Sequence, residues 1–177
     1  MNSNELNRRL RYALMLDDAQ VMDLFALVSH EASPELVAAW RLKEGESGFL
    51  VCPAQAVKCM LDGLIIQRRG VRENADARPE NKKNTALADT GKQSEDAHTL
   101  DNNLVLKQLK IALMLKTDDM LALVKEGGGS IGKGELGAFL RNPSARNYRR
   151  CGDQALRWFL NGLASRRQAT DISGKKA

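Results

Sequence analysis

Four arginines, a tyrosine and two asparagines crowd into one short segment in the second half of the chain. It reads Arg141-Asn142-Pro143-Ser144-Ala145-Arg146-Asn147-Tyr148-Arg149-Arg150. Guanidinium groups and the N–H groups of a helix N-terminus bind phosphate, and an exposed tyrosine can stack on a nucleic-acid base. The segment therefore predicts nucleic-acid contact through Arg141, Arg146, Asn147, Tyr148, Arg149 and Arg150. The alternative is a solvated loop whose Tyr148 plugs the core.

Lysines elsewhere in the same half of the chain extend this basic set. Lys107 and Lys110 stand three residues apart on a predicted helix, as Arg8 and Arg11 do in the first half, and Lys133 begins another helix. Residues at this spacing share one face of a helix. We therefore add Lys107, Lys110 and Lys133 to the predicted nucleic-acid-binding residues, with an ordinary solvated face as the alternative.

Two cysteines, Cys52 and Cys151, each precede a predicted helix. A helix N-terminus lowers the pKa of a thiol and can make it nucleophilic. A nucleophile also needs a base, and the histidines of the chain are His30 and His98, neither of which is near a cysteine in the sequence. Buried, inert thiols are the favoured interpretation, and an enzyme would have to act through Cys151.

Signals for metals and cofactors are weak. The chain has no Cys-x-x-Cys and no His-x-x-x-His pattern. Gly127 and Gly132-Lys133 have the spacing of a phosphate-binding loop, but Gly134 stands where that loop needs Ser or Thr. We expect no metal, no cofactor and a loose turn between helices at these glycines.

Positive charge is concentrated in one part of the chain. Residues 1–70 hold eight basic and nine acidic residues, whereas residues 101–177 hold fourteen basic and seven acidic ones. Such asymmetry favours a polyanionic partner, RNA or DNA, over a neutral one, with solubility as the alternative.

The chain repeats itself. At an offset of 99 residues, positions 4–69 match positions 103–168 without a gap and with 15 identities in 66 positions. Such a register predicts two copies of one unit. The matched positions to which we assign structural roles are Trp40 and Phe139, Gly63 and Gly162, and Cys52 and Cys151.

Apolar periodicity predicts four helices in each copy, and hence an all-α fold. The expected ranges are 5–16, 18–29, 34–43 and 53–69, then 104–115, 118–126, 133–141 and 153–168. Asn4, Asp17 or Asp18, Ser33 and Thr117 are the expected N-caps, and Gly70 is the expected end of the fourth helix. The second and third helices of a copy also permit a helix-turn-helix, with 34–43 or 133–141 as the recognition helix.

The expected organisation is a first helical repeat at 1–70, a flexible polar linker at 71–102, a second, basic repeat at 103–169 and a disordered tail at 170–177. Residues 71–101 hold too few apolar side chains to offset the entropy of ordering them. Because two small four-helix units have marginal cores, we expect the copies to pack on each other with pseudo-twofold symmetry.

The same composition bears on location. No stretch approaches the roughly 20 apolar residues that cross a membrane, and the first residues lack a secretory pattern. Three cysteines without paired spacing favour a reducing compartment. We expect a cytoplasmic protein with no membrane partner.

The chain resembles the YehS-like bacterial proteins, an uncharacterised family with a duplicated domain of unknown function. The resemblance spans both copies and implies a small cytoplasmic protein, without an activity or catalytic residues to transfer. It rests on Arg11-Tyr12-Ala13-Leu14-x-Leu16-Asp17-Asp18, Gly63-Leu64-Ile65-Ile66-x-Arg68-Arg69-Gly70 and Asn147-Tyr148-Arg149-x-Cys151-Gly152-Asp153-Gln154-x-Leu156-Arg157-x-Phe159-Leu160-x-Gly162-Leu163.

These observations favour a non-enzymatic binding protein whose second copy contacts nucleic acid, as RNA or a ribonucleoprotein. The first alternative is an adaptor that binds another protein in a groove between the copies. The remaining alternatives are a DNA-binding regulator of helix-turn-helix type and an enzyme acting through Cys151.

Overall fold

The computed structural model describes residues 1–70 and 100–174, with side chains described as far as residue 167. The predicted linker at 71–102 therefore lies almost wholly outside the described residues. The described chain is all helical, as predicted, and its helices are α1 (Ser3–Leu14), α2 (Asp18–Ala26), α3 (Pro34–Ala39), α4 (Ala54–Arg69), α5 (Asn102–Ala112), α6 (Thr117–Glu126), α7 (Lys133–Phe139) and α8 (Asp153–Gly174).

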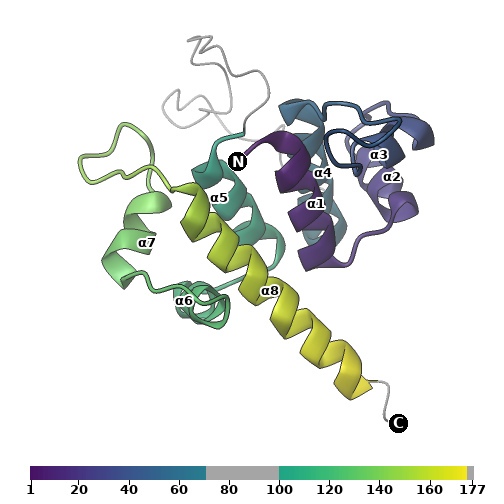
Figure 1. Ribbon diagram of the computed structural model, residues 1–177. Coiled ribbons are helices and arrows are strands. Elements are labelled where there is room, and N and C mark those ends of the chain that lie inside the picture. Colours follow the sequence, from purple (N-terminus) through teal and green to yellow (C-terminus); the bar gives the residue numbers. More distant parts are fainter. Residues whose placement is uncertain (71–99, 175–177) are drawn as a thin grey trace.

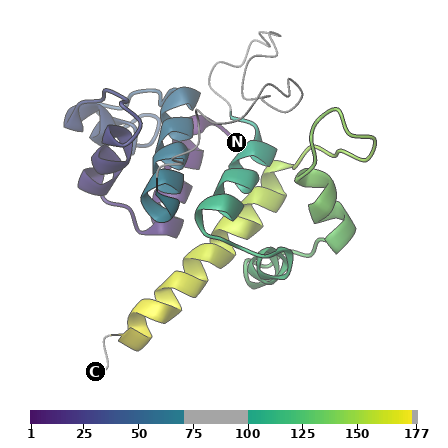
Figure 2. The same ribbon diagram turned by 180° about the vertical axis from the view of Figure 1, so that it is seen from behind.

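Four of these helices form the centre of the molecule, and they come from both repeats. In the sequence register of the repeat, α5 corresponds to α1 and α8 corresponds to α4. Helix α1 packs against α8, and α4 packs against α5 (Figures 1 and 2). Exchanging the two repeats turns one of these contacts into the other, which confirms the predicted pseudo-twofold packing.

Helices α1 and α8 run in the same direction. At their first turns the Met1 amine pairs with the Asp153 carboxylate. One turn further Glu5 Oε1 lies 3.1 Å from Arg157 Nη2. Near their ends the Arg167 guanidinium donates to the Leu14 carbonyl at 3.3 Å. The C-terminal ends of the central helices therefore gather at one side of the bundle.

One continuous apolar core runs through both repeats, and matched leucines contribute to it from each. Leu10, Leu24 and Leu61 in the first repeat, like their counterparts in the second, are fully buried. Each such side chain contributes about 1.5–3 kcal/mol relative to exposure. The outer helices α2 and α6 complete this core by packing on α4 and α8.

The two mid-helix glycines lie where these outer helices come closest. A Cβ atom at Gly63 would overlap the Leu24 carbonyl oxygen, and one at Gly162 would overlap the Leu123 carbonyl oxygen. Glycine in a helix interior costs about 1 kcal/mol relative to alanine. Both repeats bear this cost because no other residue allows the backbones to approach so closely.

The glycine-rich turn after α6 is not the loose turn that we expected. A Cβ atom at Gly127 would overlap the backbone of Trp158, and one at Gly129 would overlap its indole ring. At the matched positions of the first repeat the residue sizes are reversed: His30 stands in place of Gly129, and Cys59 in place of Trp158. Gly127 therefore allows close approach to the α8 backbone, and Gly129 makes room for the Trp158 ring.

Asn4 is not the N-cap of α1. The cap is Asn2, whose side chain accepts from the Glu5 N–H at 2.8 Å. Asn4 is buried and its amide donates to the carbonyls of Trp40 (3.1 Å) and Leu50 (2.9 Å), while its oxygen accepts from the Cys52 N–H at 2.9 Å. The Asn4 side chain thus ties three backbone segments together.

Asn103 makes the same three contacts in the second repeat. It donates to the carbonyls of Phe139 (2.8 Å) and Arg149 (2.7 Å) and accepts from the Cys151 N–H at 2.8 Å. We call each of these arrangements an asparagine clamp. Because the clamps take up the carbonyls of Trp40 and Phe139, α3 and α7 end at Ala39 and Phe139 rather than near the predicted residues 43 and 141.

Other helix ends differ from prediction for local reasons. Helix α1 ends at Leu14 and α5 at Ala112 because Met15 (φ 55°) and Met114 (φ 52°) adopt left-handed conformations. Helix α2 ends at Ala26, before the left-handed Ser29.

Two further predictions near helix ends were wrong. Thr117 is the first residue inside α6 rather than its cap, and the Lys116 N–H donates to Asp119 at 2.8 Å. Helix α8 continues to Gly174, into the segment from 170 that we expected to be a disordered tail.

Candidate nucleic-acid interface

The predicted arginine segment forms a loop, residues 140–152, between α7 and α8. It extends from the outer side of the second repeat, away from the first (Figure 1). Arg141, Arg146, Arg149 and Arg150 are all exposed. Within the described residues none of these four guanidinium groups forms an ion pair. The loop therefore presents its positive charge to solvent.

The base of this loop is held by the second asparagine clamp. The clamp fixes the Arg149 carbonyl and the Cys151 N–H to α5, so that the loop re-enters the core at a defined point. Cys151 is buried, and burial raises the pKa of its thiol to about 12; the Cys52 thiol, buried in the first repeat, has its pKa raised to about 12 for the same reason. Both thiols are neutral at physiological pH, which suits a packing role.

Tyr148 is neither fully exposed, as base stacking would favour, nor fully buried, as a core residue would be. Its ring is half-buried, as is that of its counterpart Phe49, and burial raises the pKa of its phenol. One part of the ring is therefore covered and the other part faces solvent. Asn147 beside it is exposed.

Lys133 lies apart from the loop, at the opposite end of α7. Its Nζ is 3.4 Å from Asp118 Oδ1, and both side chains are largely exposed. An exposed pair of this kind contributes little stability, but the carboxylate offsets part of the lysine charge. Lys133 is therefore the weakest of the predicted contacts.

Lys107 and Lys110 line a groove at the junction of the two repeats. The groove encloses about 520 Å³ and has no carboxylate in its lining. It lies where α4 and α5 run side by side (Figure 2). We call it the α4–α5 groove, and its lining residues are Arg69, Lys107, Lys110, Ile111, Met114, Leu115 and Leu140.

Arg69 and the apolar residues of this groove were missed in the sequence. Arg69 belongs to the first repeat, and its place beside Lys110 depends on how the repeats pack. One signal was available: Met15 and Met114 are identical at matched positions just past a helix end, where a methionine is not needed for the core. Met114 is 72% exposed.

Three further features of the described part of the chain concern metal ligands, membrane spans and the helix-turn-helix alternative. Among these residues no three His, Cys, Asp or Glu side chains gather as metal ligands would. None of the described helices is both long enough and apolar enough to span a membrane. Helices α3 and α7 have only 6 and 7 residues, which is short for a recognition helix.

Comparison with known proteins supports the duplication independently. The family model described as protein of unknown function, DUF1456, matches the chain twice, at residues 3–70 and 102–168. The uncharacterized protein YehS of Escherichia coli (strain K12) is 40% identical over 166 residues, which cover 94% of this chain and 96% of that protein. No solved structure matches significantly. The chain therefore belongs to the DUF1456 family, with one copy of the family's domain in each repeat.

Proposed function

We propose that this protein binds nucleic acid, as RNA or a ribonucleoprotein, through the arginine loop of its second repeat. The observation that carries the proposal is the set of four exposed arginines without an ion-pair partner among the described residues. A loop tied at its base by a buried clamp presents these charges with a smaller entropy loss on binding than a free segment would.

Arginines elsewhere in the molecule are used differently. Arg11 is buried and pairs with Asp18. Arg157 pairs with Glu5, and Arg166 pairs with Glu126 at 2.6 Å. Within the described residues, these three arginines have carboxylate partners, whereas the four loop arginines have none. Unneutralised cations at one surface are what phosphate contact and counterion release require.

The proposal is for a binding protein and not an enzyme. The neutral thiols of Cys52 and Cys151 support this, since a nucleophilic cysteine needs a lowered pKa. The proposal also places the protein in the cytoplasm, where nucleic acid is available and where three free cysteines remain reduced.

The test is the salt dependence of binding to a labelled RNA, followed by fluorescence anisotropy. If phosphate contacts dominate, log K falls linearly with log salt, with a slope of about −0.7 per contact for a single strand and about −0.9 for a duplex. Binding that does not change between low and physiological salt would contradict phosphate recognition.

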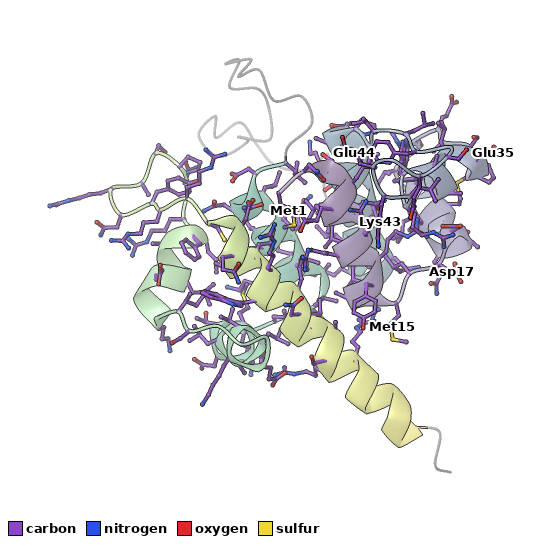
Figure 3. All side chains as sticks on the ribbon, in the orientation of Figure 1. Met1, Met15, Asp17, Glu35, Lys43 and Glu44 are labelled. Atoms are coloured by element: carbon purple, nitrogen blue, oxygen red, sulfur yellow. The ribbon has the colours of Figure 1, made fainter. Side chains whose placement is uncertain are left out.

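The matched variants remove equal charge from the two repeats. R146A/R149A/R150A should abolish binding, because the loop loses three of its four cations. R41A/K43A/K58A removes three cations from the first repeat, where Lys43 lies on the far side of the molecule from the loop (Figure 3). This control should keep most of the affinity; equal losses in the two variants would mean that only net charge matters.

A further inference from the structure

We propose that the α4–α5 groove binds an unpaired nucleotide of the nucleic acid, so that the protein prefers single strands to duplexes. The phosphate would lie among Arg69, Lys107 and Lys110, and the base would lie against Ile111 and Met114. This inference rests on the proposed function and adds to it a second contact site and a substrate class.

The lining of the groove includes positions at which the two repeats have diverged. In the first repeat Arg8 donates to the Leu42 carbonyl at 3.0 Å, and the buried Arg11 donates to the Val37 carbonyl at 3.4 Å and pairs with Asp18. These contacts keep both cations within the repeat.

The second repeat has lysines at these two positions, and Thr117 stands where the first repeat has Asp18. Lys107 and Lys110 consequently form no ion pair within the described residues, and both line the groove. Leu140 stands at the position that matches Arg41 and adds an apolar side chain to the groove lining. The substitutions thus free two cations and add apolar surface at the same place.

The edge of the groove carries an exposed methionine in a strained conformation. Met114 has a φ of 52°, which costs a residue with a side chain about 1 kcal/mol. Methionine is flexible and polarisable, and it makes favourable contacts with aromatic rings. An apolar side chain exposed at the edge of a cationic groove provides a surface for a base beside a surface for its phosphate.

The combination of cations and apolar surface favours a single strand. A duplex presents phosphates to a groove of this size but keeps its bases stacked and paired, whereas a single strand can place a base on an apolar platform. The groove also connects with the arginine loop through α5. Asn103, which clamps the loop, is followed on the same helix by Lys107 and Lys110 at spacings of four and three residues. A strand that follows α5 from the loop toward its C-terminal end would contact both sites.

The test compares a labelled oligouridine with an RNA duplex of the same length, using the full-length protein. Wild type should bind the single strand more tightly. M114A should weaken oligouridine binding about fivefold, as expected for removing part of a methionine side chain that the bound base covers, and should leave duplex binding unchanged. K107A/K110A should reduce the salt slope for oligouridine by about 0.7 for each phosphate that the variant no longer binds.

The matched control is M15A. Met15 occupies the same repeat position in the same left-handed conformation (φ 55°), is 49% exposed, and projects from the end of α1 (Figure 3). It should bind like wild type, and the thermal melts of both methionine variants should match wild type because both side chains lie at the surface.

Four outcomes would overturn the inference. The first is equal affinity of wild type for single strand and duplex. The second is normal oligouridine binding by M114A, and the third is an equal loss of affinity in M114A and M15A. The fourth is an M114A variant that loses affinity only for an acidic amphipathic peptide, because the groove would then be a protein-docking site. In the first three cases loop-dependent RNA binding, and hence the proposed function, can still hold. If neither RNA binds to wild type, the proposed function itself fails.

Discussion

Replacing Asn103 by alanine should destabilise the protein more than most single substitutions do. The clamp makes hydrogen bonds of 2.8, 2.7 and 2.8 Å to Phe139, Arg149 and Cys151. Each contributes about 1 kcal/mol net, and leaving a buried donor unpaired adds about 1–3 kcal/mol. The expected loss is therefore about 4 kcal/mol, a large share of the roughly 5–15 kcal/mol that stabilises a typical domain.

The measurement is urea unfolding followed by far-ultraviolet circular dichroism. N103A should lower the midpoint without changing the slope of the transition. N4A should show a similar loss, because the first clamp makes the same three bonds. The control is N147A, since Asn147 is an exposed asparagine in the clamped loop, and its loss should lie within about 0.5 kcal/mol of zero.

Hydrogen exchange gives a second reading of the same clamp. The Cys151 N–H donates to Asn103, so its exchange should be slow in wild type and should accelerate in N103A. A stability loss below about 1 kcal/mol, with unchanged exchange at Cys151, would refute the reasoning. It would mean that water replaces the carboxamide and that the loop is held by other contacts.

Three further predictions concern packing and ionisation. G162A should destabilise the protein by about 1–3 kcal/mol or more, because the added Cβ overlaps the α6 backbone. G137A has open space around the added Cβ and should stabilise the protein by up to about 1 kcal/mol. Thermal melts distinguish the two variants. Burial raises the pKa of Asp62 above its ordinary value, so the folded state holds this proton more tightly than the unfolded state. Its contribution to stability is present at low pH and is lost as pH rises through the folded-state pKa, and D62N should raise the urea midpoint at neutral pH but not in acid. Cys52 and Cys151, with pKa values of about 12, should react with a disulfide reagent at pH 8 only after denaturant is added; rapid reaction in the native state would contradict their burial.

The fold could be predicted because the duplication shows each helix pattern twice in the sequence. Apolar periodicity that is ambiguous in one copy becomes convincing when it recurs at a fixed offset, and the caps Asp17 and Ser33 were visible as local patterns. Asn4 was misassigned because its partners lie 36 to 48 residues away. The alignment of the two repeats contained the relevant signal. Asn2 aligns with Asp101, and both residues are N-caps, so the matched Asn4 and Asn103 are not needed as caps.

The candidate site could be predicted only in part, because part of it depends on long-range placement. The exposure of the loop arginines follows from a polar segment between helices. The α4–α5 groove does not, since Arg69 reaches Lys110 only through the packing of one repeat on the other. The glycines after α6 were misleading for a similar reason: Trp158, which requires them, is far away in the sequence.

The reciprocal contacts of α1 with α8 and of α4 with α5 give this single polypeptide the pseudo-twofold arrangement of a symmetric dimer. In a dimer of identical subunits every substitution appears twice. Two copies of the basic second repeat would double its positive charge around one interface and would repel each other. Fusion removes that constraint, because the near-neutral first repeat keeps the shared scaffold while its partner accumulates charge. A gene duplication of this kind lets one repeat of a pseudo-symmetric fold change its surface charge without the same substitutions in the other repeat.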